Sequence, residues 1–99
     1  MMDYQEHTDK DVRLTILKAL ASENDKRLNE TIITHILKNF GHTRSREYVR
    51  TQIRKLADLG AVGVTEVGSV LVAQLKQPGL DHVERRTFLE GVLQPSLDS

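Results

Sequence analysis

The stretch that decides the fold covers residues 45–75 and reads SREYVRTQIRKLADLGAVGVTEVGSVLVAQL. Its first half repeats apolar residues at the spacing of an amphipathic helix. These residues are Val49, Ile53, Leu56 and Ala57. Gly60 follows at the position where a left-handed residue commonly ends a helix. The second half holds two β-branched runs separated by Gly68-Ser69, which is typical of a β-hairpin. We therefore predict a helix over about 45–59 and then a two-stranded hairpin.

Two further helices are expected before this stretch. The first lies in residues 11–24, where Val12, Ile16, Leu17 and Leu20 recur at helical spacing, with Thr8 or Asp9 as its N-cap. The second carries the apolar series Leu28, Ile32, Ile33, Ile36, Leu37 and Phe40, with Asn29 as its N-cap and Gly41 as its end. Thr43 and Ser45 are alternative N-caps for the third helix.

The remaining elements complete one small domain. The apolar positions of the hairpin are expected to be Val62, Val64, Val70 and Val72. Pro78-Gly79 ends the second strand, and residues 80–93 are predicted to form a last helix. Its inward residues would be Leu80, Val83 and either Leu89 or Val92. The predicted fold is α+β, mainly α: a winged helix-turn-helix over residues 1–93 with three helices, a two-stranded β-hairpin wing and a C-terminal helix, followed by a disordered tail over residues 94–99.

The formal net charge of zero conceals an uneven distribution of charge along the chain. Residues 42–55 carry a net charge of +4, whereas residues 1–41 carry −1 and residues 56–99 carry −3. The positive segment coincides with the start of the helix that would enter the major groove of DNA in this fold. The charge pattern therefore favours double-stranded DNA as a partner.

Individual DNA contacts follow from the position of each side chain on this helix. Arg46, Glu47, Arg50, Thr51 and Arg54 are the candidates for contact with bases or nearby phosphates. Arg44 and Lys55 are expected to bind phosphates. An ordinary solvated helix face is the alternative interpretation of these charges. The hairpin tip, residues 66–69, is acidic and lacks the lysine or arginine that a wing uses to hold phosphates.

Several other classes of protein are disfavoured by the sequence. The chain has no cysteine, and His7, His35, His42 and His82 lack the spacing of metal ligands, so we expect no metal and no cofactor. His82 is the histidine closest to acidic neighbours and the least unfavourable for metal or pH sensing. No phosphate loop, nucleophile elbow or pair of catalytic carboxylates is found, so we expect no enzyme activity and no catalytic residues. Without an apolar stretch that spans a membrane or a signal segment, we expect a cytoplasmic protein.

The sequence resembles two groups of winged-helix proteins. EYVRTQIRKLADLGAVGVTEVGSVLVAQL resembles the recognition helix and wing of ArsR-like proteins. The segments DVRLTILKAL, RLNETIITHILKNFGH, SREYVRTQIRKLADLGAV and PGLDHVERR resemble a small winged-helix family encoded by Mu-like phages and prophages, over roughly residues 11–86. The resemblance implies an ArsR-like transcriptional regulator, although the cysteines of ArsR-type metal sensors are absent.

Two main functions remain open at the level of the sequence, and a third possibility is that the helix over about 45–59 binds DNA only non-specifically. The first is a sequence-specific DNA-binding regulator of phage or prophage transcription, expected to act as a homodimer. In ArsR-like folds the first and last helices form the dimer, which makes Tyr4, Val83, Phe88 and Leu89 the candidate interface residues, with the domain's own core as the alternative role. The second function is a winged-helix adaptor that binds another phage protein during assembly or packaging, without specific DNA binding.

Overall fold

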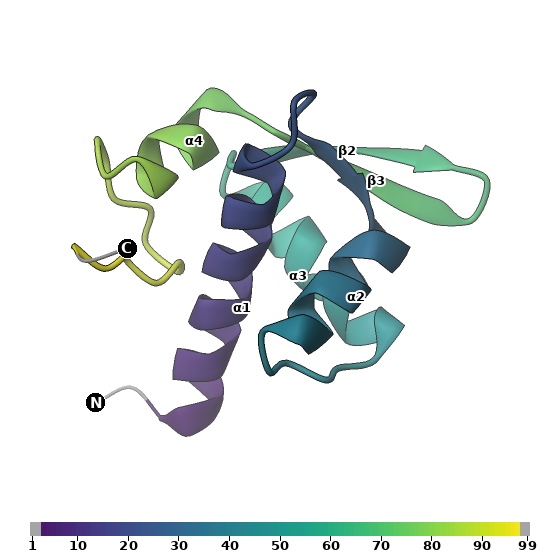
Figure 1. Cartoon of the computed structure of the whole chain (residues 1–99), viewed down its shortest axis with the longest axis horizontal. Coiled ribbons are helices and arrows are strands. Elements are labelled where there is room, and N and C mark those ends of the chain that lie inside the picture. Colours follow the sequence, from purple (N-terminus) through teal and green to yellow (C-terminus); the bar gives the residue numbers. More distant parts are fainter. Residues whose placement is uncertain (1–2, 98–99) are drawn as a thin grey trace.

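Helix α1 (Tyr4–Ala21) lies in the middle of the molecule, with residues 77–97 on one side and residues 27–75 on the other (Figure 1). The structure is a computed structural model that describes residues 3–97. These residues form an α+β domain, as predicted. Its elements are α1, β1 (Arg27–Asn29), α2 (Glu30–Asn39), α3 (Arg46–Asp58), β2 (Val62–Val67), β3 (Val70–Leu75) and α4 (Gln77–Val83). None of the helices in residues 3–97 is long and apolar enough to cross a membrane.

Helix α1 begins earlier than predicted. Its N-cap is Asp3, whose carboxylate accepts a hydrogen bond from the Glu6 amide at 2.7 Å, so the assignment of Thr8 or Asp9 as the cap is wrong. The Thr8 hydroxyl instead donates to the Tyr4 carbonyl at 2.9 Å, one turn back inside the helix. The first turn was missed because it carries no buried residue, and apolar periodicity detects only the part of a helix that packs on a core.

Strand β1 was not predicted. Residues 27–29 pair antiparallel with β3, so the sheet has the order β1-β3-β2. Leu28, which we had assigned to the second helix, lies in this strand opposite Ala73, and both are buried. A strand of three residues is too short for a period of two to be visible, and its partner lies more than forty residues away along the chain.

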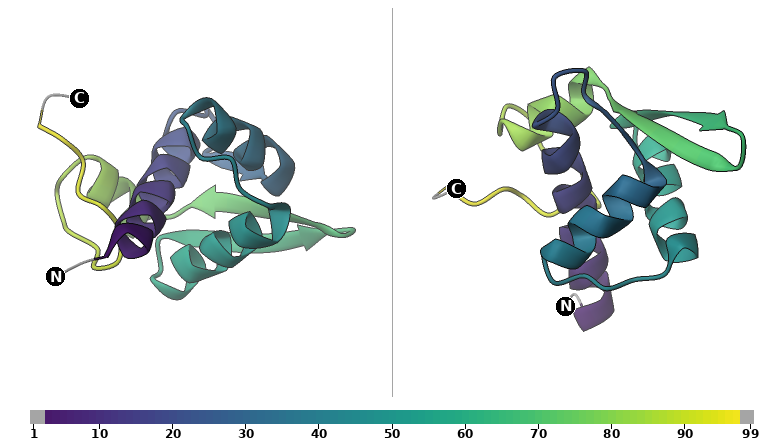
Figure 2. Two further views of the ribbon diagram at one scale, coloured as in Figure 1. Left: turned by 90° about the horizontal axis from the view of Figure 1, so that it is seen from below. Right: turned by 45° about the vertical axis from the view of Figure 1, so that its right-hand side comes forward.

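The predicted ends of the two middle helices are confirmed. Asn29 caps α2 by accepting from the Ile32 amide at 2.9 Å, and Ser45 caps α3 by accepting from the Tyr48 amide at 3.1 Å. Gly41 and Gly60 follow these helices with φ of +89° and +78°, a conformation that favours glycine. Helix α3 packs on α1, α2 and β2, and its outer side is left open to solvent (Figure 2).

The hairpin is confirmed, but the inward side of its second strand is not the one predicted. β2 and β3 pair from Val62↔Leu75 to Val67↔Val70 around Gly68-Ser69. The buried residues of β3 are Leu71, Ala73 and Leu75, whereas Val70 and Val72 are only partly buried. Every position but one in β3 is apolar, so the sequence shows no alternation of apolar and polar residues that would identify the buried side. Pairing with the buried Val62 of β2 decides which side of β3 faces the core.

The predicted last helix is much shorter than expected. α4 ends at Val83, and Arg85 has a φ of +64°, which ends helical geometry. Residues 84–97 then run irregularly along α1, with Val92 and Pro95 buried. The prediction of a disordered tail concerns residues 94–99, of which Asp98 and Ser99 lie outside the described residues.

Candidate nucleic-acid interface

The seven residues predicted to bind DNA lie on α3 and on the loop before it. Glu47, Thr51, Arg54 and Lys55 are exposed on the outer side of α3, as the helical pattern predicted. The buried side of the helix consists of Val49, Gln52, Ile53 and Leu56. Arg44, Arg46 and Arg50 each bind another part of the protein, and these contacts determine what the surface offers to a ligand.

A buried carboxylate organises the start of α3. Glu30 is the first residue of α2, and none of its surface is exposed. It accepts hydrogen bonds from Arg46 Nε at 2.8 Å and from Arg50 Nη1 at 2.6 Å. It also accepts one from the Leu71 backbone amide in β3 at 2.6 Å. One side chain therefore joins α2, α3 and the hairpin.

Glu30 is ionised at neutral pH. Burial by itself raises the pKa of a carboxyl group, because it disfavours the charged form. The hydrogen bond from Leu71 and the two guanidinium groups favour the charged form, and together they lower the pKa of Glu30 below its ordinary value of 4.5. The site therefore holds a carboxylate and two cations, with one positive charge in excess.

The contacts of Glu30 change the roles available to two of the predicted DNA-binding residues. Arg50 is largely covered by the protein and also donates to the Ser69 carbonyl at the hairpin tip, at 3.1 Å. Its guanidinium is thus held between α3 and the hairpin, whereas the sequence predicted a contact with bases or nearby phosphates. Arg46 remains half exposed and donates to the Thr31 hydroxyl at 3.3 Å.

Sequence reasoning missed Glu30, although a signal was present. Glu30, Ile33 and Leu37 share one side of α2, because spacings of three and four residues return to the same side of a helix. All three are buried. An acidic residue on the apolar side of a helix indicates a buried charge that requires a cationic partner.

The hairpin tip adds negative charge to the same surface. Arg54 Nη2 lies 3.9 Å from Glu66 Oε1, and both side chains are about half exposed. A hollow of about 350 Å³ separates the start of α3 from the tip. Its lining is formed by Glu30, Arg46, Glu47, Arg50, Glu66 and Ser69. Three of the five cations of residues 42–55 therefore lie within 4 Å of the carboxylate of Glu30 or Glu66, and the surface is less positive than the sequence segment alone suggests.

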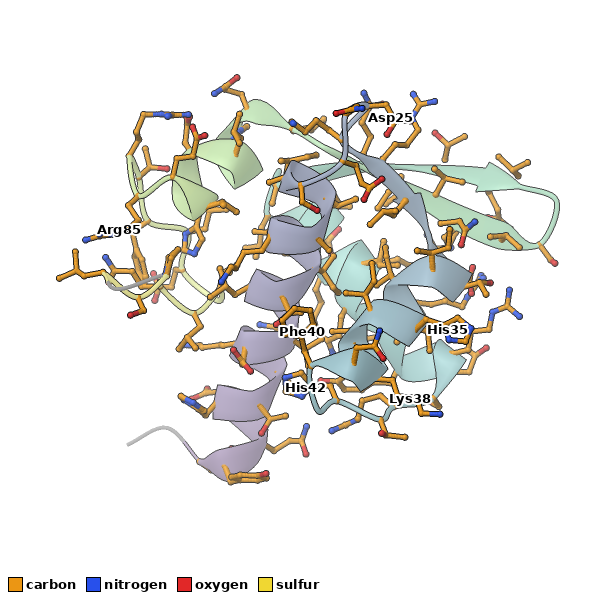
Figure 3. All side chains as sticks on the ribbon, viewed as in Figure 1. Asp25, His35, Lys38, Phe40, His42 and Arg85 are labelled. Carbon is orange, nitrogen blue, oxygen red and sulfur yellow. The ribbon has the colours of Figure 1, made fainter. Side chains whose placement is uncertain are left out.

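The loop before α3 is held in place by aromatic and polar contacts. Arg44 stacks over the ring of Tyr48, with its guanidinium carbon 3.8 Å from the ring centre. The Tyr48 hydroxyl donates to Asp9 in α1. Burial and this hydrogen bond raise the pKa of Tyr48 to about 12. His42 binds Asp11 of α1 at 2.8 Å (Figure 3). These contacts fix the position of Arg44 relative to α3.

The other predicted residues are distributed over the opposite part of the molecule. Tyr4 and Phe88 are exposed, whereas Val83 and Leu89 are half-buried against the domain's own core. His82 is fully buried, and both of its ring nitrogens bind backbone groups of Leu89 and Leu93. Within residues 3–97, no three His, Asp or Glu side chains are grouped as metal ligands.

Comparisons with known proteins show a similarity to a phage protein. The chain is 38% identical over 85 residues to a protein described as "Uncharacterized protein gp26" from Escherichia phage Mu. The alignment covers 86% of this chain and 88% of the phage protein. This relative confirms the resemblance to proteins of Mu-like phages. No protein-family model matches the chain, and no solved structure matches it.

Proposed function

The chain belongs to the family of the Escherichia phage Mu protein gp26, and we propose that it binds double-stranded DNA as a winged helix-turn-helix regulator of phage or prophage transcription. In this proposal α2 and α3 form the helix-turn-helix, and β2 and β3 form the wing. The observation that supports it best is the outer side of α3, where Arg46, Arg54 and Lys55 are exposed beside the hairpin tip.

The contacts of each cation suggest its role on DNA. Arg46 and Arg54 are half exposed on α3 and are the candidates for the bidentate contact that arginine makes with guanine in the major groove. Lys55 and Arg44 are assigned to phosphates, as the sequence predicted. Arg50 is assigned a structural role, because its side chain is only 24% exposed and its guanidinium binds Glu30 and the Ser69 carbonyl.

The test of this proposal is a salt titration of binding to duplex DNA, followed by fluorescence anisotropy. Affinity should fall steeply with salt, because each phosphate contact releases a counterion. Lys55→Gln should weaken binding and reduce the logarithmic salt slope by about 1, because Lys55 is assigned to a phosphate. Arg85→Gln is the matched control, since Arg85 is exposed on the far side of α1 from α3 (Figure 3). The absence of binding at low salt to any duplex would contradict the proposal.

The second candidate function is the adaptor that binds another phage protein. The observation in its favour is the acidic hairpin tip, where Glu66 pairs with Arg54 and Val67 is 62% exposed. An exposed apolar side chain within a surface of mixed charge suits a protein partner better than a phosphate backbone. The same titration separates the two functions, because an adaptor would show no salt-dependent affinity for DNA.

A further inference from the structure

The side chain of Arg46 is held by two contacts that leave one edge of its guanidinium free. Arg46 Nε donates to Glu30 Oε2 at 2.8 Å, and Arg46 Nη2 donates to the Thr31 hydroxyl at 3.3 Å. Both acceptors lie in the first turn of α2. Within residues 3–97, the Nη1 group of Arg46 has no hydrogen-bond partner, and the side chain is 54% exposed. Nη1 and the second hydrogen of Nη2 therefore remain as a pair of parallel donors that a ligand can reach.

The two oxygens of the Glu30 carboxylate have separate partners. Oε1 accepts hydrogen bonds from Arg50 Nη1 and from the Leu71 amide, both at 2.6 Å, whereas Oε2 accepts one from Arg46 Nε. Arg50 is the closer and the more buried of the two cations, so it offsets the charge of the carboxylate. The excess positive charge of the cluster therefore lies at the more exposed Arg46.

The surroundings of Arg46 favour a base over a phosphate as its ligand. Glu47 and Glu66 line the same hollow as Arg46. A phosphate bound there would bring a negative charge towards these two carboxylates, whereas the edge of a base is neutral. Arg46 is also the first residue of α3, and the N-terminal residues of a recognition helix are the ones that reach base edges. The two free donors match the O6 and N7 acceptors that guanine presents in the major groove.

We propose that Arg46 reads a guanine in the major groove and that Glu30 and Thr31 are positioning residues, which fix the direction of its free edge. This inference rests on the proposed DNA-binding function. Arg54, the other candidate for a guanine contact, lies 3.9 Å from Glu66, and within residues 3–97 no hydrogen bond holds its guanidinium. A side chain that is already held in one orientation loses less conformational freedom when it binds. Arg46 therefore confers the preference for guanine, and Arg54 contributes mainly charge.

The first experiment measures the contribution of Arg46 to the guanine preference. A duplex selected by the wild-type chain from a random library is the probe, and each of its guanines is replaced in turn by 7-deazaguanine, which lacks the N7 acceptor. One replacement should lower the wild-type affinity, measured by fluorescence anisotropy, by roughly tenfold. Arg46→Lys keeps the charge but loses the planar pair of donors, so the same replacement should cost this variant much less. Arg54→Lys is the matched control and should show the full wild-type loss.

The second experiment tests the role of Glu30 with the variant Glu30→Gln. The single amide oxygen of glutamine should face Arg50 and the Leu71 amide, so that its NH₂ group faces Arg46 Nε, which is also a donor. The variant thus releases Arg46 and keeps the contact with the hairpin. The ratio of the affinities for the unmodified and the modified duplex should fall towards one. A purely structural role of Glu30 would lower both affinities equally and leave this ratio unchanged.

A milder variant tests Thr31. Thr31→Val keeps the shape of the side chain but removes the acceptor of Arg46 Nη2, and the ratio should fall less than in Glu30→Gln because this contact is the longer one. Thr15→Val is the matched control, since the Thr15 hydroxyl binds only within α1, and it should leave the ratio unchanged.

The outcomes separate this inference from the proposed function. A wild-type chain that binds duplex DNA but is insensitive to every replaced guanine would overturn the inference alone. An unchanged loss in Arg46→Lys, or an equal reduction of the loss in Arg46→Lys and Arg54→Lys, would do the same. An unchanged ratio in Glu30→Gln would overturn the positioning role of Glu30. The absence of binding to any duplex at low salt would overturn the proposed function and this inference with it.

Discussion

Two regions on opposite sides of α1 each contain a buried ionisable side chain, and they satisfy it in different ways. On the α3 side, Glu30 is charged and binds two guanidinium groups and a backbone amide. On the α4 side, His82 binds backbone groups alone: its Nε2 faces the Leu93 carbonyl at 2.9 Å, and its Nδ1 faces the Leu89 amide at 3.0 Å. The amide requires an unprotonated Nδ1, so the ring in this arrangement is neutral.

The difference shows what each region requires for its stability. Residues 84–97 lack regular hydrogen bonding, and the neutral ring of His82 supplies a donor and an acceptor to two of their backbone groups. The α3 side instead brings several cations to one surface, where their mutual repulsion opposes folding. A buried carboxylate offsets that repulsion and fixes two of the arginines. We therefore expect the α3 side to depend on charge pairing, and the α4 side to depend on hydrogen-bond geometry.

Replacement of Glu30 should have the largest effect on stability. Glu30→Ala leaves the buried Leu71 amide without its acceptor and releases two arginines, so the free energy of unfolding should fall by about 3 kcal/mol in urea denaturation. Glu30→Gln retains an acceptor for the amide and should lose less. Glu47→Ala, on the exposed side of α3, is the control and should change stability by less than about 0.5 kcal/mol. Equal effects of Glu30→Ala and Glu47→Ala would show that the carboxylate does not hold the two elements together.

Replacement of His82 should have the next largest effect. His82→Ala removes both ring hydrogen bonds and leaves a cavity, at a cost of about 2 kcal/mol. The Leu89 amide should also exchange faster with solvent, because it loses the acceptor that His82 Nδ1 provides. His35→Ala, on the exposed side of α2, serves as the control. Unchanged exchange at Leu89 would exclude His82 as the group that orders this segment.

Acid should weaken the α3 side through Glu30. The pKa of Glu30 is lower in the folded protein than its ordinary value of 4.5. The unfolded chain therefore takes up this proton first, so the contribution of Glu30 to stability is complete above the ordinary pKa and is lost as the pH falls through the folded pKa. Urea midpoints of the wild type and Glu30→Gln should differ by a constant amount near neutral pH and converge in acid. If the urea midpoints of the two proteins instead fall in parallel as the pH falls, the acid sensitivity comes from other carboxyl groups.

Local patterns in the sequence were sufficient for much of the fold. The caps at Asn29 and Ser45, the glycines that follow α2 and α3, and the hairpin turn all depend on short-range chemistry, and all are confirmed. Strand β1 and the inward side of β3 depend on pairing between distant residues, which periodicity does not report. After the early end of α4, His82 binds backbone groups of Leu89 and Leu93, and apolar periodicity does not report such contacts either.

Sequence patterns were also insufficient to predict the contacts of the candidate site. The sequence located the cationic helix, but net charge counted along the chain does not show which cations have partners. Glu30 lies far from Arg46 and Arg50 in the sequence, and Glu66 reaches Arg54 only through the hairpin. The spacing of Glu30 with Ile33 and Leu37 predicts its burial, but the identity of its partners requires the tertiary arrangement.

The smallest effect on stability is expected at the exposed pair Arg54 and Glu66, where the effect on DNA binding should instead be clear. Glu66→Gln should change the free energy of unfolding by less than about 0.5 kcal/mol, because exposed ion pairs contribute little. It should raise the affinity for duplex DNA by roughly threefold to tenfold at low salt, since it removes a carboxylate 3.9 Å from an arginine of the proposed interface. The gain should disappear in the double variant with Arg54→Gln, because the two side chains act as a coupled pair.

Glu90→Gln, on the α4 side, removes the same charge away from α3 and should leave the affinity for duplex DNA nearly unchanged. Equal gains from Glu66→Gln and Glu90→Gln would indicate a general effect of net charge, and the α3 surface would then have no special role in binding.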